Sequence, residues 1–257
     1  MSGRFSTRIW AHRMLPGPPG VIENTLPGLM SCLTHGYNVE CDVQVLHDNH
    51  TCIVFHDDTL DRLAGPAVKG LVTALTPSTF SRITLAEDTP IPLFTDVLDL
   101  VARWLTLYPD DTDFCLNIEL KSRGTAQPVV TLLQEWISRT ALCPHHFLLS
   151  SFYWDELMRA ATTLHQAGLS IALAVLSEQD MPGAIHMAHQ LKAERIHLSA
   201  QMATPEVIAT MHANGFQVAF YTVDTPEEMG NLLRWGADAL FTNRPDRLYS
   251  QLDLLAA

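Results

Sequence analysis

The stretch RIHLSAQMATPEVIATMHANGFQVAFYTVDTPEEMGNLLRWGADALFT, residues 195–242, contains the repeating unit that decides the fold. Three short apolar runs in this stretch are separated by two helix-like segments. These segments begin after Thr204 and Thr225, each of which is followed by proline, and end before Gly215 and Gly236. Threonine before a first-turn proline is typical of a helix start, and glycine is typical of a helix end. The alternation predicts parallel strands that are joined by helices.

The same alternation extends along the whole chain of 257 residues. The strand candidates are short apolar or β-branched runs, namely Arg8–Ala11, Asn38–Val45, Asp113–Lys121, His146–Ser150, Ser170–Val175, Arg195–Leu198, Gln217–Val223 and Ala239–Thr242. The helix candidates between them are Thr25–His35 (with Asn24 as its N-cap), Phe94–Tyr108, Val129–Thr140, Trp154–Gln166, Met181–Leu191, Pro205–Asn214 and Pro226–Trp235. One further extended run, Cys52–Phe55, is predicted to form a hairpin arm after the second strand.

Eight strands in this length favour an α/β fold of the TIM-type (β/α)8 barrel class, with a short hairpin insertion after the second strand. We expect one such domain across residues 1–257. The alternative is an open Rossmann-like sheet, but no strand candidate is followed by the GxGxxG pattern of that fold.

The composition is that of a globular protein with enough apolar material for a core, at 47% hydrophobic and 17% charged residues. The net charge of −12 repels nucleic acid and anionic membranes, so we expect no nucleic-acid partner. The sequence has no apolar run near the roughly 18 residues of a membrane span, and residues 1–10 do not resemble a signal peptide. We therefore expect a cytoplasmic protein without stable membrane insertion; the sequence does not indicate its oligomeric state.

The cysteines favour free thiols in a reducing compartment. They are odd in number and none forms a CxxC pair, which argues against a disulfide framework or a zinc site. The five are Cys32, Cys41, Cys52, Cys115 and Cys143.

Acidic residues stand in the second and third predicted barrel strands, and enzymes of this fold place their chemistry where the strands end. Glu40 and Asp42 are two residues apart on a strand, so both point to the same face. Two neighbouring carboxylates repel each other unless a cation lies between them, and oxygen ligands favour Mg²⁺ or Ca²⁺ over zinc. Glu119 and Lys121 repeat this spacing, and together they could hold a metal and a substrate oxyanion.

Two histidines also lie at the ends of extended runs. His12-Arg13 follows the first strand, and His56-Asp57 follows the hairpin arm. Each of these motifs alone is more often a solvated face or an ordinary loop than a functional site. Their joint placement at predicted strand ends is what points to an active site.

The order of the motifs resembles the glycerophosphodiester phosphodiesterase family over roughly residues 8 to 248. The resemblance rests on a series of short motifs in a fixed order, which are His12-Arg13, Glu23-Asn24-Thr25, Glu40-Cys41-Asp42-Val43, His56-Asp57 with Leu60-Asp61-Arg62, Ile91-Pro92, Asn117-Ile118-Glu119-Leu120-Lys121, Ser151-Phe152, Val218 to Asp224, Gly236-Ala237-Asp238 and Thr242-Asn243-Arg244-Pro245. It implies a TIM-type barrel that hydrolyses a small-molecule phosphodiester to an alcohol and a phosphomonoester.

The resemblance also implies roles for individual residues. It implies one divalent cation, Mg²⁺ or Ca²⁺, held by Glu40, Asp42 and Glu119. It makes His12 and His56 the acid/base pair. We favour His56 as the base and His12 as the acid, but the sequence leaves the opposite assignment open. Arg13 and Lys121 become phosphate contacts. Tyr221 stands where the family commonly has tryptophan, and the strand phase turns it to the mouth of the barrel, although a role in the core is an equal alternative.

Two other functions stay open at this stage. In the family a neighbouring substrate hydroxyl is thought to attack first, so a lyase would stop at the resulting cyclic phosphate. A barrel that only binds phosphodiesters is the non-catalytic alternative, although a binder has no need of an acid/base pair. The stretch from Asp57 to Pro92 is short for the family, and it leaves the alcohol specificity open.

Overall fold

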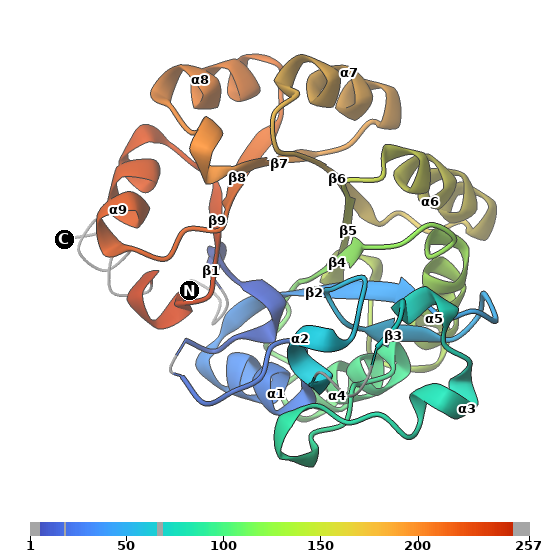
Figure 1. Ribbon diagram of the computed structural model, residues 1–257. Coiled ribbons are helices and arrows are strands. Elements are labelled where there is room, and N and C mark those ends of the chain that lie inside the picture. The colour runs from blue at the N-terminus through green and yellow to red at the C-terminus, as the bar shows by residue number, and fades with distance from the viewer. Residues whose placement is uncertain (1–5, 18, 66–68, 249–257) are drawn as a thin grey trace.

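A computed structural model describes residues 6–17, 19–65 and 69–248 (Figure 1). Eight parallel strands form a closed barrel in the order β1-β2-β4-β5-β6-β7-β8-β9, and β9 pairs with β1 to complete the ring. The strands are β1 (Ser6–Ala11), β2 (Tyr37–Val45), β4 (Leu116–Leu120), β5 (Phe147–Ser151), β6 (Ala172–Ser177), β7 (Arg195–Ser199), β8 (Gln217–Tyr221) and β9 (Ala239–Thr242). The predicted TIM-type (β/α)8 barrel is confirmed.

The long helices connect these strands and surround the barrel. They are α1 (Leu26–His35), α4 (Phe94–Leu107), α5 (Ala126–Arg139), α6 (Trp154–Ala167), α7 (Met181–Leu191), α8 (Pro205–Ala213) and α9 (Pro226–Trp235). The predicted threonine caps form: Thr204 accepts a hydrogen bond from the backbone N–H of Val207, and Thr225 accepts one from that of Glu228. The predicted cap of α1 was wrong, because Thr25 takes the N-cap position and the Asn24 side chain instead bonds to a buried carboxylate.

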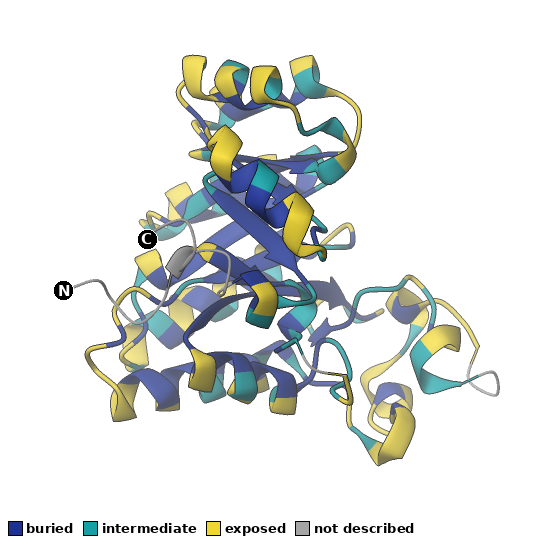
Figure 2. Cartoon of the chain, turned by 90° about the vertical axis from the view of Figure 1, so that its left-hand side faces the viewer, coloured by how far each residue is buried: buried dark blue, intermediate teal, exposed yellow. Residues whose placement is uncertain are grey.

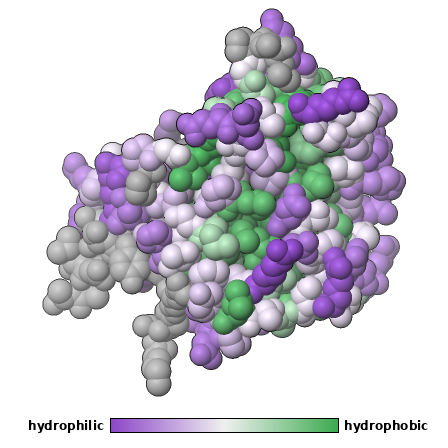
Figure 3. All heavy atoms as spheres, turned by 90° about the horizontal axis from the view of Figure 1, so that it is seen from below, coloured by the Kyte–Doolittle hydropathy of each residue, from purple (hydrophilic) through white to green (hydrophobic). Residues whose placement is uncertain are grey.

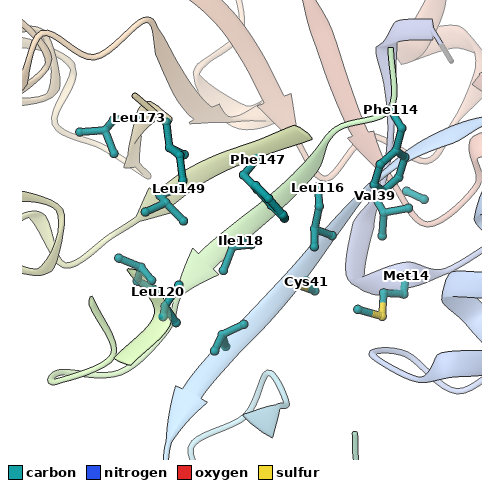
Figure 4. Close-up of a cluster of buried hydrophobic side chains, with 14 of the residues drawn as sticks. Met14, Val39, Cys41, Phe114, Leu116, Ile118, Leu120, Phe147, Leu149 and Leu173 are labelled. Atoms are coloured by element: carbon teal, nitrogen blue, oxygen red, sulfur yellow. The ribbon is translucent and has the colours of Figure 1, made fainter. Parts of the chain in front are cut away.

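Strand periodicity divides the side chains between two layers. Figure 4 shows side chains of one layer, which come from alternate residues of β2, β4, β5 and β6 and include Val39, Cys41, Leu116, Ile118, Leu149 and Leu173. These residues belong to one apolar cluster with buried residues of the surrounding helices. The intervening residues face the barrel interior, where Trp10, Leu148, Ala174, Ala219, Ala239 and Phe241 form a separate apolar cluster. Both layers are dark blue in Figure 2, whereas the outer helical faces are exposed. Burial on both faces explains why the strands read as continuous apolar runs.

The hairpin insertion follows β2, as predicted. Strand β3 (Cys52–Val54) pairs antiparallel with β2, and the chain then forms α2 (Asp61–Ala64) and α3 (Pro77–Phe80) before it reaches α4. In Figure 1 these elements lie on the side of the ring that carries α1 and α4. The insertion has an apolar cluster of its own, formed by Leu46, Ile53, Phe55, Leu60, Val72, Phe80, Leu85 and Ile91.

Short 3-10 turns complete the described secondary structure. They are His12–Met14, Val72–Ala74, Ala86–Asp88, Pro144–His146 and Ala200–Met202. Among the described residues, no helix has the length and apolar character needed to cross a bilayer. On the face seen in Figure 3, apolar side chains are interspersed with hydrophilic ones.

Candidate active site

Three acidic side chains from β2 and β4 meet inside the barrel. In the parallel register of these strands, Glu40 lies opposite Asn117 and Asp42 lies opposite Glu119. One carboxylate oxygen from each of Glu40, Asp42 and Glu119 lies within 4.8 Å of the other two, and the three residues are 3%, 1% and 8% exposed. We call these three residues the carboxylate triad. The structure thus brings together the three predicted metal ligands.

The electrostatics of the carboxylate triad favour a bound cation. Burial, followed by the charges of Asp42 and Glu119, raises the pKa of Glu40 well above its usual value. Burial and the Asp42 charge likewise raise the pKa of Glu119 to about 7, against the opposing effect of Lys121. Burial alone would also raise the pKa of Asp42, but nearby positive groups, led by Lys121, lower it. A divalent cation would remove the repulsion that disfavours three ionised carboxylates in one place.

Among the buried side-chain polar atoms without a hydrogen-bond partner in the described part of the chain are two oxygen atoms of residues that line the same pocket. They are Oε1 of Glu40 and Oδ1 of Asn117. An unsatisfied buried acceptor is costly, and a hard cation with oxygen ligands satisfies such acceptors. The donor set therefore fits Mg²⁺ or Ca²⁺. The sequence analysis missed Asn117 as a site residue, although its position two residues before Glu119 places it on the same face of β4.

Two cationic side chains border the carboxylate triad. The Lys121 Nζ donates to Glu119 Oε1 at 2.9 Å and lies 3.7 Å from Asp42 Oδ1. Arg13 lies with its Nε 3.8 Å from Asp42 Oδ2, and its backbone N–H donates to Glu40 Oε2 at 2.7 Å. Arg13 adopts a φ of 51°, in the left-handed region that non-glycine residues rarely enter. That conformation is held by the contact with Glu40 and keeps the guanidinium beside the acidic cluster.

His12 is held by residues from the opposite end of the sequence. Its Nδ1 lies 2.9 Å from the side-chain oxygen of Asn243, which follows β9. The Asn243 amide donates to Asp224 Oδ2 at 2.9 Å, and its backbone N–H donates to Asp224 Oδ1 at 2.8 Å. Burial, with the charge of Arg13, lowers the pKa of His12 to about 4, so the ring is neutral near pH 7.

His56 is held through a different set of contacts. Its Nδ1 lies 2.7 Å from Asp57 Oδ1. The Arg62 guanidinium, from α2, donates two hydrogen bonds to Asp57 and two to Glu23. The Glu23 carboxylate also accepts a hydrogen bond from the Arg13 guanidinium at 3.1 Å. Burial raises the pKa of Asp57, but the Arg62 hydrogen bonds outweigh it and lower that pKa to about 2. Glu23, His56 and Asp57 also lie close enough to hold a metal, but the Arg62 guanidinium already supplies the positive charge there.

One pocket collects these groups. Its lining includes seven of the eight predicted site residues, His12, Arg13, Glu40, His56, Glu119, Lys121 and Tyr221, while Asp42 completes the carboxylate triad. Tyr221 contributes its ring to the pocket wall. Its hydroxyl donates to the backbone oxygen of Ser177 at 3.0 Å. The sequence analysis missed Phe152, which packs edge-on against Tyr221 with ring centres 5.6 Å apart, and also Glu178 and His197. Phe152 could have been found, because it follows β5 directly, whereas nothing in the local sequence marks Glu178 or His197.

The acidic cluster, the two histidines and the two cationic side chains lie at the C-terminal mouth of a (β/α)8 barrel, where enzymes of this fold have their active sites. The comparison with protein families identifies the class of enzyme. Residues 11–247 match the glycerophosphoryl diester phosphodiesterase family. The chain belongs to this family and is a phosphoric diester hydrolase.

Similar proteins span nearly the full length of the chain. A glycerophosphodiester phosphodiesterase of Bacillus altitudinis is 29% identical over 252 residues, covering 94% of this chain and 96% of the relative. An enzyme of the same description from Caldanaerobacter subterraneus subsp. tengcongensis is 24% identical over 257 residues, covering 95% and 97%.

Solved structures show the same fold at lower identity. A glycerophosphoryl diester phosphodiesterase from Silicibacter pomeroyi DSS-3 superposes with a TM-score of 0.81 at 19% identity, covering 98% of this chain and 94% of that one. A phosphodiesterase from Oleispira antarctica, solved with the product sn-glycerol-3-phosphate, superposes with a TM-score of 0.78 at 21% identity and 96% coverage of both chains.

Proposed function

We propose that this protein hydrolyses glycerophosphodiesters, or related sugar phosphodiesters, to an alcohol and a phosphomonoester, with one divalent cation and two histidines as its acid/base pair. The observation that carries the proposal is the convergence of the carboxylate triad with His12 and His56 in one pocket. A protein that only bound phosphodiesters would gain nothing from two imidazoles beside the same cation site.

The charged groups have separate tasks in this proposal. The carboxylate triad and the Asn117 oxygen would hold Mg²⁺ or Ca²⁺, which supplies charge stabilisation to the phosphoryl oxygens and orients the substrate. Lys121 and Arg13 would contact the remaining phosphoryl oxygens, because each is a cation beside the triad. These positive charges also overcome the repulsion between an anionic diester and a chain of net charge −12.

The two histidines divide the proton transfers. One imidazole accepts the proton of a substrate hydroxyl next to the phosphate, and the O–P bond forms as that proton leaves. The other imidazole donates a proton to the departing alkoxide as the second P–O bond breaks. Water then opens the cyclic phosphate in the reverse sense, with the roles of the two rings exchanged.

The pocket suits a small substrate. It encloses about 170 Å³, which is below the roughly 300–1,000 Å³ of pockets for drug-sized ligands. Its wall combines the rings of Phe152 and Tyr221 with polar groups, an arrangement that fits a short polyol ester. The names of the relatives, and the sn-glycerol-3-phosphate bound to the Oleispira antarctica enzyme, support glycerol as the alcohol that keeps the phosphate.

A ³¹P NMR assay tests the proposal. The purified chain is incubated with glycerophosphocholine and with a panel of glycerol and sugar phosphodiesters, with Mg²⁺, with Ca²⁺ and with chelator. We expect a phosphomonoester signal that requires the cation. Unchanged substrate across the panel with either metal would refute the proposed activity.

The same spectra separate the hydrolase from a lyase, since a five-membered cyclic phosphate resonates far from a monoester. Glu119→Gln is the inactive control, because it removes one ligand without changing size. Glu135→Gln, an exposed carboxylate on α5, is the matched control that keeps full activity. Full activity in Glu119→Gln would mean that the carboxylate triad has no part in the reaction.

A further inference from the structure

The contacts of Asn243 determine which nitrogen of His12 carries the proton. Both oxygens of Asp224 accept hydrogen bonds from Asn243, one from the backbone N–H and one from the side-chain amide. A carboxylate has no proton to donate, so the NH₂ end of the Asn243 amide must face Asp224. The oxygen end then faces His12, and it can only accept from Nδ1.

We propose that Asp224, acting through Asn243, positions His12 with its proton on Nδ1 and the lone pair of Nε2 directed to the substrate, so that His12 is the general base and His56 the general acid. The assignment rests on the proposed function, and it reverses the roles that we favoured from the sequence. Asp224 is a positioning residue, because it touches Asn243 and not the reacting atoms.

The surroundings of the two histidines support this division. His12 has a neutral amide partner and lies half-buried next to Arg13, and its pKa is lowered to about 4, so it meets the substrate as a neutral ring. His56 instead has a carboxylate partner, since Asp57 Oδ1 lies 2.7 Å from its Nδ1. The two rings therefore differ in their hydrogen-bond partners, a neutral amide for His12 and a carboxylate for His56, and we assign the base and the acid on this difference.

The proton balance follows from these positions. The attacking hydroxyl gives its proton to Nε2 of His12 as its oxygen bonds to phosphorus, and His12 becomes an imidazolium whose Nδ1–H stays bound to Asn243. The departing alkoxide takes the Nε2 proton of His56, which becomes neutral and keeps its Nδ1–H on Asp57. Asp224 and Asp57 thus support opposite halves of one transfer.

Long-range ¹⁵N–¹H NMR of histidine-labelled protein reads the tautomer directly and needs no substrate. With saturating Mg²⁺, the His12 signals, identified by their loss in His12→Gln, should show protonated Nδ1 and unprotonated Nε2. Asp224→Asn lets the Asn243 amide adopt either orientation, so the Nδ1–H preference should be lost. Asp238→Asn is the matched control, since Asp238 pairs with His212 and does not line the pocket, and its His12 signals should match the wild type. A wild-type spectrum with the proton on Nε2 would overturn the assignment, whatever the activity of the chain.

Kinetics with two leaving groups provide the second readout. In Asp224→Asn, kcat should fall roughly 10- to 100-fold with little change in KM, because only the proton transfer is misaligned. The loss should be equal for an alkoxide and for p-nitrophenolate as the leaving group, since the base acts on the attacking hydroxyl. The kcat of His56→Gln should instead recover on the p-nitrophenyl diester of glycerol phosphate, because p-nitrophenolate leaves without needing a proton. Recovery of His12→Gln in place of His56→Gln would show that the roles are the reverse.

Discussion

Replacing Glu119 by glutamine should stabilise the protein without metal and remove most of its response to metal. Burial and the Asp42 charge raise the folded-state pKa of Glu119 from 4.5 to about 7, so its ionised form destabilises the fold. One pKa unit corresponds to about 1.4 kcal/mol, which gives a penalty of about 3 kcal/mol at pH 8. Stability is therefore lost as pH rises from the unfolded-state pKa through the folded one, and at pH 5 the penalty is below about 1 kcal/mol.

Urea unfolding in chelator measures this effect. Glu119→Gln should be more stable than the wild type by about 3 kcal/mol at pH 8, and the difference should fall below about 1 kcal/mol at pH 5. Adding Mg²⁺ at 100 times its dissociation constant should stabilise the wild type at pH 8 by about 2.7 kcal/mol and the variant far less.

The control for this experiment is Glu135→Gln, which removes an exposed carboxylate paired with Arg139 on α5 and should change stability by less than about 1 kcal/mol at either pH. The reasoning fails if Glu119→Gln is no more stable than the wild type at pH 8, or if its advantage is as large at pH 5. Either result would mean that the buried carboxylates do not repel each other as their positions require.

Three further outcomes follow from the site. Arg62→Gln removes the guanidinium shared by Asp57 and Glu23, so steady-state kinetics should show kcat lowered about 10-fold or more; an unchanged kcat would mean that His56 needs no such support. Tyr221→Phe should leave kcat/KM within about 3-fold of the wild-type value, because the hydroxyl bonds to Ser177 and not to the substrate. Tyr221→Ala should raise KM about 3- to 10-fold, because it removes the ring from the pocket wall. Equal effects of the two substitutions would contradict this division between hydroxyl and ring. Calorimetric titration should show cation affinity rising with pH up to about 7, because protons on the carboxylate triad compete with the metal; pH-independent affinity would exclude that competition.

The barrel could be predicted because its signals are local. Each strand–helix unit contains its own start and stop residues, such as Thr204 and Gly236, and neither depends on distant parts of the chain. The carboxylate triad could be placed for a similar reason, since a two-residue spacing fixes the face on which Glu40 and Asp42 lie. The structure brings these side chains together, and their catalytic roles remain the proposal made above.

The parts that sequence reasoning missed depend on closure of the barrel or on very short elements. Asn243 reaches His12 only because β9 pairs with β1, and the two residues are 231 positions apart. Asn24 has the chemistry of a helix cap, but a buried carboxylate competes for its side chain. The helices α2 and α3 have four residues each, too few to show any periodicity.

The separate apolar cluster of the insertion has an evolutionary consequence. Since Leu60, Val72 and Phe80 pack within that cluster and not in the main core, their exchange leaves the barrel layers intact. Natural drift, or a deliberate graft from a relative, can therefore change the packing of the insertion without touching the cation ligands. A transplanted segment would have to keep Arg62, because its hydrogen bonds to Asp57 connect the insertion to the residue that contacts His56.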